Sequence, residues 1–128
     1  MSLLQGIMGN ATEAHIEELT KELAFVLLEH EKIETAYKIL RDFFVFTDRR
    51  LILVDKQGLM GKKVEYLSIP YDEIGHFSIE CAGPFDLESD LKIWIKGQAS
   101  PLITKFNKDS HIESVNKTLA HYILAPKL

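Results

Sequence analysis

The spacing of apolar residues changes twice along this chain, and no other feature limits the fold as strongly. From Asn10 to Leu28 apolar residues recur every three or four positions, after Glu31 they alternate, and from Asp109 the wider spacing returns. A period near 3.6 indicates an amphipathic helix, and a period of two indicates a strand with one buried face. The sequence therefore predicts a helix, a run of strands and a second helix.

Each predicted helix has its own stripe and end signals. The stripe of the first helix consists of Ile16, Leu19, Leu23 and Val26, and that of the second consists of Ile112, Val115, Leu119, Tyr122 and Ile123. Asn10 and Thr12 are alternative N-caps of the first helix, because their side chains accept hydrogen bonds from free amides of the first turn. Ser110 and Glu113 have capping-box spacing before the second helix, and Pro126 predicts its end.

Alternating residues between the helices predict six or seven strands. The residues that share strand faces are Ile33, Thr35, Tyr37 and Ile39; Phe44 and Phe46; Leu51 and Leu53; Phe77, Ile79 and Cys81; Leu91, Ile93 and Ile95; and Leu102, Thr104 and Phe106. Turn signals separate them at Asp55 to Gly58, Gly61, Pro70, Gly83-Pro84, and Gly97 to Pro101. Connections this short favour an antiparallel meander, because parallel crossovers need about a dozen residues or more. Alternation breaks around Pro70, where a bulge or corner is expected.

The stretch FVFTDRRLILV, from Phe44 to Val54, contains two strand-like runs joined at Thr47 to Arg50. This polar corner is either a catalytic cluster or a tight turn, and the turn is favoured because Asp commonly bonds backbone amides in turns. Both faces of the hairpin are apolar, since Val45, Ile52 and Val54 lie opposite the phenylalanines and leucines. We expect a terminal helix or a second subunit to cover the outer face.

Composition limits the classes of function. The chain has 128 residues, a formal net charge of -4 and one cysteine, Cys81. This length matches one domain, and an acidic chain lacks the basic surface of a nucleic-acid binder, so no nucleic-acid partner is expected. A single cysteine forms no intrachain disulfide, which predicts a reduced, cytoplasmic protein. The N-terminal sequence lacks the basic region of a signal peptide, and no apolar stretch reaches the roughly 18 residues that a membrane helix needs.

No catalytic residue, cofactor or metal site is predicted. The five histidines, at positions 15, 30, 76, 111 and 121, form no pair with metal-ligand spacing. Asp86 to Asp90 lacks the central Gly and distant Glu of a calcium loop and is expected to be a solvated connection. Cys81 is in phase with Phe77 and Ile79, so we expect a small core residue rather than a nucleophile.

Two surfaces are candidates for binding a partner. The first is one strand face with Lys92, Trp94 and Lys96, which is either a tryptophan shielded by lysine stems or a contact site. The second comes from one hairpin and the turn after it, and it is either a basic patch or an ordinary solvated surface. Its members are Arg49, Arg50, Lys56, Lys62 and Lys63.

The segments RDFFVFTDRRLILVDKQG, GKKVEYLSIPYDEIGHFSIE and DLKIWIKG, with the closing helix, resemble the bacterial pleckstrin-homology-domain family. The resemblance covers nearly the whole chain. It implies a mainly β fold, a seven-stranded antiparallel bent barrel of residues 31–128 capped by the C-terminal helix, with residues 1–30 as an N-terminal helical extension. It also implies assembly into rings. The loop around Leu40 to Phe43 offers Arg41 beside Asp42 and little else, which argues against inositol-phosphate binding.

These observations predict a non-catalytic interaction or scaffold module that homo-oligomerises. The candidate assembly surface consists of Ile16, Leu19, Leu23, Val45, Ile52 and Val54. The alternative is a weak adaptor for anionic membrane surfaces, which uses the basic hairpin turns. The candidate surface for a protein or lipid partner consists of Trp94, Lys92, Lys96, Arg49, Arg50, Lys62 and Lys63.

Overall fold

The structure is a computed structural model of the chain, and it describes residues 13–39, 42–58, 62–81, 88–107 and 112–125. The chain divides into two compact units, Met1–Ile69 and Pro70–Leu128. The expected N-caps, the capping-box serine and the Gly83-Pro84 turn lie outside the described residues. Among the helices of the described part, none is long and apolar enough to cross a membrane.

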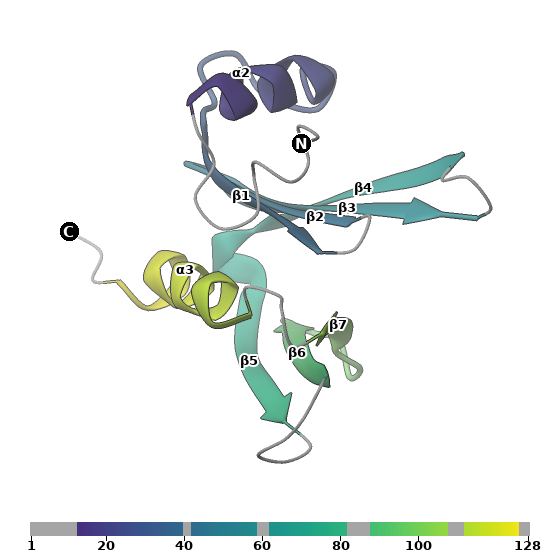
Figure 1. Cartoon of the computed structure of the whole chain (residues 1–128). Coiled ribbons are helices and arrows are strands. Elements are labelled where there is room, and N and C mark those ends of the chain that lie inside the picture. The colour runs from purple at the N-terminus through teal and green to yellow at the C-terminus, as the bar shows by residue number, and fades with distance from the viewer. Residues whose placement is uncertain (1–12, 40–41, 59–61, 82–87, 108–111, 126–128) are drawn as a thin grey trace. The chain divides into compact units, whose positions relative to one another are not determined.

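The first unit contains a helix and a four-stranded sheet (Figure 1). Its elements are helix α2 (Glu13–Glu22) and strands β1 (Ile33–Ile39), β2 (Asp42–Thr47), β3 (Arg50–Gln57) and β4 (Lys63–Pro70). Sequential strands are neighbours in the sheet, and the β1–β2 and β2–β3 pairs are antiparallel, which confirms the predicted meander. The helix ends before the predicted Leu28, and the chain continues in turns.

Helix α2 lies over one face of this sheet (Figure 1) and packs on the apolar side chains of that face. The buried cluster between them contains Leu19, Leu23, Ile33, Ala36, Phe43, Val45, Ile52 and Val54. The side chains of Tyr37, Phe44, Phe46 and Leu51 are buried as well. Both faces of the central hairpin are therefore apolar because both are buried, and a terminal helix of the same chain covers the outer one.

A β-bulge at the start of β1 changes the face that Ile33 occupies. Ile33 pairs with Thr47, whereas Thr35 pairs with Phe46, so two residues of β1 oppose one step of β2. An inserted residue reverses the alternation of a strand, because the side-chain period is two. The prediction that Ile33 shares a face with Tyr37 is therefore wrong, and Ile33 packs in the cluster beneath α2.

Strand β3 continues beyond its predicted end. The sequence indicated a turn from Asp55, but β3 runs to Gln57, and Gly58 is the residue with a left-handed φ of 74°. Asp42, the first residue of β2, accepts a hydrogen bond from the Lys56 amide at 3.0 Å. This bond supports the extended end of the strand, where polar side chains had indicated a turn.

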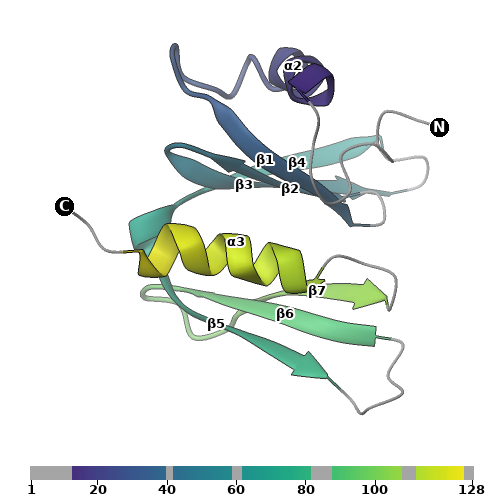
Figure 2. The same cartoon turned by 60° about the vertical axis from the view of Figure 1, so that its left-hand side comes forward.

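The second unit is a three-stranded antiparallel sheet with a helix lying along it (Figure 2). Its elements are the 3-10 helix η2 (Tyr71–Glu73), strands β5 (Ile74–Cys81), β6 (Glu88–Ile95) and β7 (Leu102–Asn107), and helix α3 (Ile112–Leu124). The buried side chains of the unit include Leu91, Ile93, Phe106, Val115 and Leu119. The predicted stripe of the second helix is thus confirmed at Val115 and Leu119, its two buried positions.

Three details of the second unit concern earlier predictions. The predicted corner follows Pro70, where η2 precedes β5. Cys81 is exposed, with its thiol 3.5 Å from the Ser89 hydroxyl, so the prediction of a core cysteine is wrong. The reason is that β5 is an edge strand whose last residues are exposed. Glu88 to Asp90 belong to β6 rather than to a solvated loop.

The mainly β, antiparallel class is confirmed, with seven strands and helices α2 and α3 before and after them among the described residues. The strands form one sheet of four and one of three, and neither sheet closes on itself.

Candidate functional site

The corner between β2 and β3 is a hydrogen-bonded turn. The Thr47 hydroxyl oxygen accepts hydrogen bonds from the amides of Arg49 (3.0 Å) and Arg50 (2.9 Å). The Asp48 amide donates to the carbonyl of Lys32, and the Asp48 carboxylate accepts from the amide of Lys32, each at 3.0 Å. The Thr47 bonds are of the local kind by which Thr side chains form turns, whereas the Asp48 bonds join the turn to Lys32, 16 positions away in the sequence. The turn interpretation of this polar stretch is therefore confirmed.

Glu31 and Arg50 form an ion pair beside this turn. Arg50 Nη2 lies 2.6 Å from Glu31 Oε1 and Nε lies 2.9 Å from Oε2, which makes the contact bidentate. The Glu31 side chain is 0% exposed and that of Arg50 is 19% exposed. The Thr47 hydroxyl is 2.7 Å from Glu31 Oε2, and Arg50 Nη1 donates to Ser68 Oγ at 3.0 Å. We call Glu31, Thr47, Arg50 and Ser68 the Glu31–Arg50 clamp.

The clamp also holds the connection between α2 and β1. Arg50 Nη2 donates to the carbonyl of Val26 at 2.8 Å, and the Leu28 amide donates to Glu31 Oε1 at 2.9 Å. In the described part of the chain, every buried side-chain nitrogen and oxygen has a hydrogen-bond partner. The clamp thus fixes the segment that connects the end of α2 to the start of β1.

The surroundings of Glu31 lower its pKa to about 2 from an ordinary value of 4.5. Hydrogen bonds from Arg50 are the main cause, burial opposes them, and the Thr47 hydroxyl and the Leu28 amide lower the pKa further. Glu31 in turn raises the pKa of Arg50. A general base needs a pKa near the working pH. The clamp is therefore suited to holding the fold and unsuited to transferring protons at neutral pH.

The six residues predicted as an assembly surface come together inside one chain. Val45 and Ile52 are 0% exposed, and Val54 is 4% exposed. Leu19 of α2 and Leu23, the residue after its end, cover them, and Ile16 packs against the same cluster. Side chains this deeply buried are not accessible to a second subunit while α2 is in place. An assembly surface therefore has to be sought among exposed residues.

The predicted basic surface is divided in the structure. Arg50 is held by Glu31, which leaves Arg49 before β3 and the exposed lysines Lys62 and Lys63 after it. These corners lie at opposite ends of β3, whose eight residues span about 25 Å at roughly 3.3 Å per residue. Lys56, near the far end of β3, is half-buried, and its ammonium group lies 5.3 Å from the centre of the Phe43 ring. The five predicted residues therefore form no single basic patch, because the length of β3 separates groups that lie close in the sequence.

Trp94 has a different neighbour from the one that the sequence suggested. Its ring stacks on that of His76, the residue opposite it in β5, with centroids 4.4 Å apart and planes at 16°. Lys92 forms an ion pair with Glu80, and Lys96 is exposed beyond the end of β6. A ring stack and an ion pair thus replace the expected indole between two ammonium groups. The histidine could not be identified as the partner without the strand register.

An exposed apolar surface, which the sequence analysis missed, lies beside the end of α2 and strand β4. Phe25 and Tyr66 form it, with exposed fractions of 71% and 37%, and Leu28, three residues after Phe25, is 60% exposed. The rings of Phe25 and Tyr66 meet edge to face, with centroids 4.9 Å apart. The run FVLL after the helix was the available signal, because it is too apolar for a one-sided stripe.

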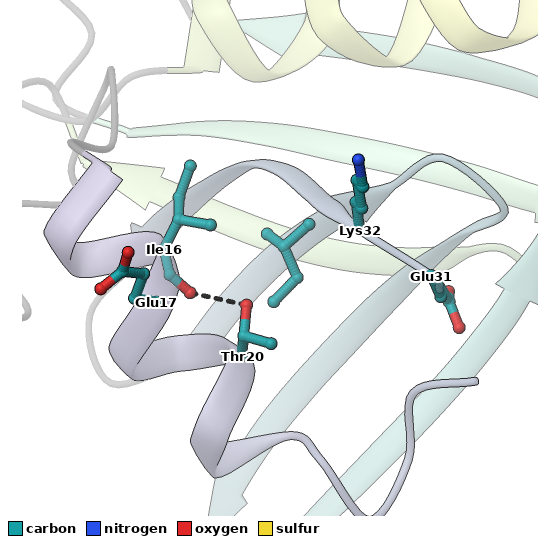
Figure 3. Close-up of a pocket in the computed structure, with 6 residues that line it drawn as sticks. Ile16, Glu17, Thr20, Glu31 and Lys32 are labelled. Carbon is teal, nitrogen blue, oxygen red and sulfur yellow. Dashed lines mark hydrogen bonds between the residues drawn. The ribbon is translucent and has the colours of Figure 1, made fainter. Parts of the chain in front are cut away.

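A groove opens between α2 and the start of β1 (Figure 3). Its volume is about 400 Å³, and it is lined by Ile16, Glu17, Thr20, Glu31, Lys32 and Ile33. Ile16 and Ile33 give it apolar surface, and the Thr20 hydroxyl donates to the Ile16 carbonyl at 2.7 Å. Glu17 on the helix and Lys32 before the strand are exposed. Neither side chain has an ion-pair partner among the residues that the structure describes.

Within the described ranges, no group of three or more His, Cys, Asp and Glu side chains is arranged to hold a metal ion. His30 is 86% exposed, His76 stacks on Trp94, and His121 contacts Tyr122. His111 lies outside the described residues.

The bacterial PH domain family matches this chain over residues 2–123. The chain belongs to that family. Among curated relatives, the uncharacterized protein YjqA of Bacillus subtilis (strain 168) is 53% identical over 121 residues, which are 94% of this chain and 97% of YjqA. The uncharacterized protein YozO of the same strain is 33% identical over 103 residues, covering 80% of this chain and 88% of YozO.

Solved structures confirm the PH-like fold. A pleckstrin homology domain from Shewanella amazonensis SB2B has a TM-score of 0.84 and 47% identity, and the match covers 97% of this chain and all of that one (100%). A DUF1696 family protein with a pleckstrin-homology domain from Shewanella loihica PV-4 has a TM-score of 0.73 and 40% identity, covering 84% and 96%. The family and the fold are therefore established, and the function has to be argued from this chain's own surface.

Proposed function

We propose that this bacterial PH domain is a non-catalytic interaction module that associates with copies of itself. The observation that carries the proposal is the exposed pair of Phe25 and Tyr66, which are 71% and 37% exposed, with Leu28, 60% exposed, three residues after Phe25. Clustered large apolar side chains on a surface mark interaction sites, and aromatic residues are enriched among interface anchors. The phenylalanine and tyrosine already contact each other, so little ordering is required when a partner covers them.

The state of the polar groups supports a non-catalytic role. The polar cluster nearest to a catalytic arrangement is the Glu31–Arg50 clamp, whose carboxylate and guanidinium bond to each other and to neighbouring groups. Catalysis by such groups needs free hydrogen-bonding capacity directed at a substrate. The polar groups of the clamp have little hydrogen-bonding capacity left for a substrate.

Solution mass tests the proposal. Light scattering on a size-exclusion column should give a multiple of the chain mass at micromolar concentration for the wild type. Phe25→Ser should shift the mass toward the monomer, whereas Leu124→Ser, which replaces a side chain 69% exposed in the second unit, should not. Circular dichroism of both variants checks that the fold is kept. A wild-type protein that stays monomeric throughout the micromolar range would contradict the proposal.

A weak adaptor for anionic membranes is the alternative, and it has less support because the basic groups are separated along β3. Lys62 and Lys63 are its remaining adjacent exposed pair. Sedimentation with phosphatidylserine vesicles distinguishes the two functions. Binding that fades with salt and is lost in a Lys62→Glu/Lys63→Glu variant would favour the adaptor.

A further inference from the structure

Strand β5 is an outer strand of the second sheet (Figure 2). It pairs with β6 along one edge, and among the described residues no strand of this sheet lies along its other edge. A free edge presents backbone N–H and C=O groups to which the strand of another chain can bond. Proteins usually protect such edges with lysine, proline, a bulge or a covering element.

The outer strands of the two sheets, β1, β4, β5 and β7, differ in this protection. β1, β4 and β7 each contain a lysine, at positions 38, 63 and 105. β5, with the sequence IGHFSIEC, contains neither lysine nor proline. Its bulge lies between Ile74 and His76, and the strand pairs regularly from there to Cys81. The edge of β5 is therefore the least protected of the four.

The two faces of β5 differ in chemistry. Ile79 pairs with Leu91 of β6, and cross-strand partners share a face of the sheet. Leu91 is buried, whereas Ile79 is 38% exposed, so the burial of this face is incomplete at β5. The opposite face of β5 carries His76 and Glu80, which are both exposed. A strand added beside β5 would thus meet apolar surface on one face and polar surface on the other.

Acidic groups determine the kind of segment that fits this edge. β5 and the preceding η2 contain Asp72, Glu73 and Glu80 and no lysine or arginine. Lys92 of β6 pairs with Glu80. Asp72 and Glu73 are exposed, and neither has an ion-pair partner in the part of the chain that the structure describes. Opposite charges on neighbouring strands attract and like charges repel, so a basic segment fits and an acidic one does not.

We propose that β5 accepts an extended segment of another protein as an additional strand, and that this segment alternates apolar residues with lysine or arginine. Its apolar side chains contact Ile79 and the half-buried Phe77, and its basic side chains lie on the face of Glu80. Main-chain hydrogen bonds supply affinity in this mode of recognition, and alternate side chains supply specificity. This use of β5 goes beyond the self-association proposed above, whose apolar surface lies in the first unit.

A synthetic peptide of alternating valine and lysine, as long as β5 and blocked at both ends, is the probe. His76 of β5 stacks on Trp94, the one tryptophan of the chain, so binding along β5 should change Trp94 fluorescence. Titration of the wild type should give a saturable change. A peptide with glutamate in place of lysine should bind more weakly by about fivefold or more. The absence of saturable binding by the lysine peptide would overturn the inference.

Backbone methylation tests whether the peptide binds as a strand. The N–H groups of an added strand point alternately toward β5 and away from it. Methylation of the valine nitrogens removes one of these sets, and methylation of the lysine nitrogens removes the other. One methylated peptide should bind like the parent, and the other should bind more weakly by about tenfold or more, because several hydrogen bonds are lost. Equal effects of the two methylations would overturn strand addition.

Variants of the protein locate the site. Ile79→Lys should weaken binding of the lysine peptide by about fivefold or more. Ile103→Lys is the matched control, since Ile103 is 54% exposed on β7, the other outer strand of the sheet, and the change in net charge is the same. It should bind like the wild type, and equal weakening in both variants would contradict the site. Circular dichroism checks that each variant is folded.

The outcomes separate this inference from the proposed function. Phe25→Ser, which tests self-association, changes the first unit and should leave peptide binding unchanged. A monomeric wild type that binds the peptide would overturn self-association alone. A peptide that does not bind, together with a lower solution mass for Ile79→Lys, would assign the edge of β5 to a second copy and overturn the inference.

Discussion

The change Glu31→Gln removes one charge of the Glu31–Arg50 clamp and keeps the size of the side chain. In the folded chain the pKa of Glu31 is about 2, against an ordinary value of 4.5. Each unit of pKa difference corresponds to about 1.4 kcal/mol, so ionised Glu31 contributes about 3 kcal/mol to the free energy of unfolding at neutral pH. We expect the variant to lose about that amount, because Arg50 then stays largely buried without a counter-charge, and breaking such pairs costs about 3 to 5 kcal/mol.

The loss should depend on pH in a defined direction. A carboxyl group whose pKa is lowered by folding stabilises the protein above its unfolded pKa, and this contribution disappears as the pH falls through the folded pKa. For Glu31 the window runs from pH 4.5 down to about 2. The difference in unfolding free energy between wild type and Glu31→Gln should therefore shrink from about 3 kcal/mol at about pH 7 to about 1 kcal/mol at about pH 3.

Urea denaturation followed by Trp94 fluorescence measures this difference at both pH values. One low protein concentration is used throughout, because self-association raises apparent stability. Glu29→Gln is the matched control, since the Glu29 side chain is 90% exposed, and its effect should stay within about 0.5 kcal/mol. A loss for Glu31→Gln that is equal at both pH values, or below the roughly 1 kcal/mol typical of surface pairs, would refute the reasoning.

Three further predictions concern the packing around this site and the exposed thiol. Thr47→Val keeps the side-chain shape but removes the hydroxyl that bonds Glu31 Oε2, and urea denaturation should show a loss of about 1 to 3 kcal/mol. Leu23→Ala leaves a cavity beneath α2 and should cost about 2 to 5 kcal/mol in the same assay, whereas Leu28→Ala, at a side chain 60% exposed, should stay within about 0.5 kcal/mol. Cys81 should react with a thiol reagent in the folded protein about as fast as in urea, because it is exposed; protection of the folded protein would contradict the structure.

The order of the elements was predictable because burial imposes a period on the sequence. The stripe of α2 and the alternation in β2 and β3 both record which side chains are buried. The two apolar faces of the hairpin also required a cover, and the sequence left open whether a helix or a second subunit supplies it. Only three-dimensional packing distinguishes these two covers, because an apolar stripe on a helix can pack against its own sheet or against a second subunit equally well.

The two errors in strand faces have different physical sources. A bulge inserts one residue into a strand, so side chains before the bulge lie on the face opposite to the one that alternation from the residues after it predicts. The register shift in β1 moved Ile33 beneath α2, and no residue type in the strand marks that position. Cys81 followed the alternation of its strand, but alternation does not show that an edge strand extends past the cover of its neighbours. The two-residue period predicts which side chains of a strand share a face, and the packing of neighbouring elements decides whether that face is buried.

The Glu31–Arg50 pair was not predicted, because its two residues are far apart in the sequence. Arg50 and Glu31 are 19 positions apart, and an arginine in a hairpin corner is usually solvated. Counting Arg50 toward a basic surface was reasonable on residue type and wrong in outcome, because charge alone does not show whether a partner has already been found. The clue was that Thr47 and Arg50 flank a turn whose two faces are apolar, where a charge has to be paired.

The clamp and the groove are connected through one peptide segment. Glu31 accepts four hydrogen bonds, two from Arg50 and one each from the Thr47 hydroxyl and the Leu28 amide. The next residue, Lys32, has its amide and carbonyl both bonded to Asp48. The backbone at the start of β1 is thus held from two sides, by the acceptor oxygens of Glu31 and by the turn at Asp48. The polar corner, for which the sequence favoured a turn over a catalytic cluster, is a turn that fixes the start of β1 and, through Arg50 and the Val26 carbonyl, the connection from α2.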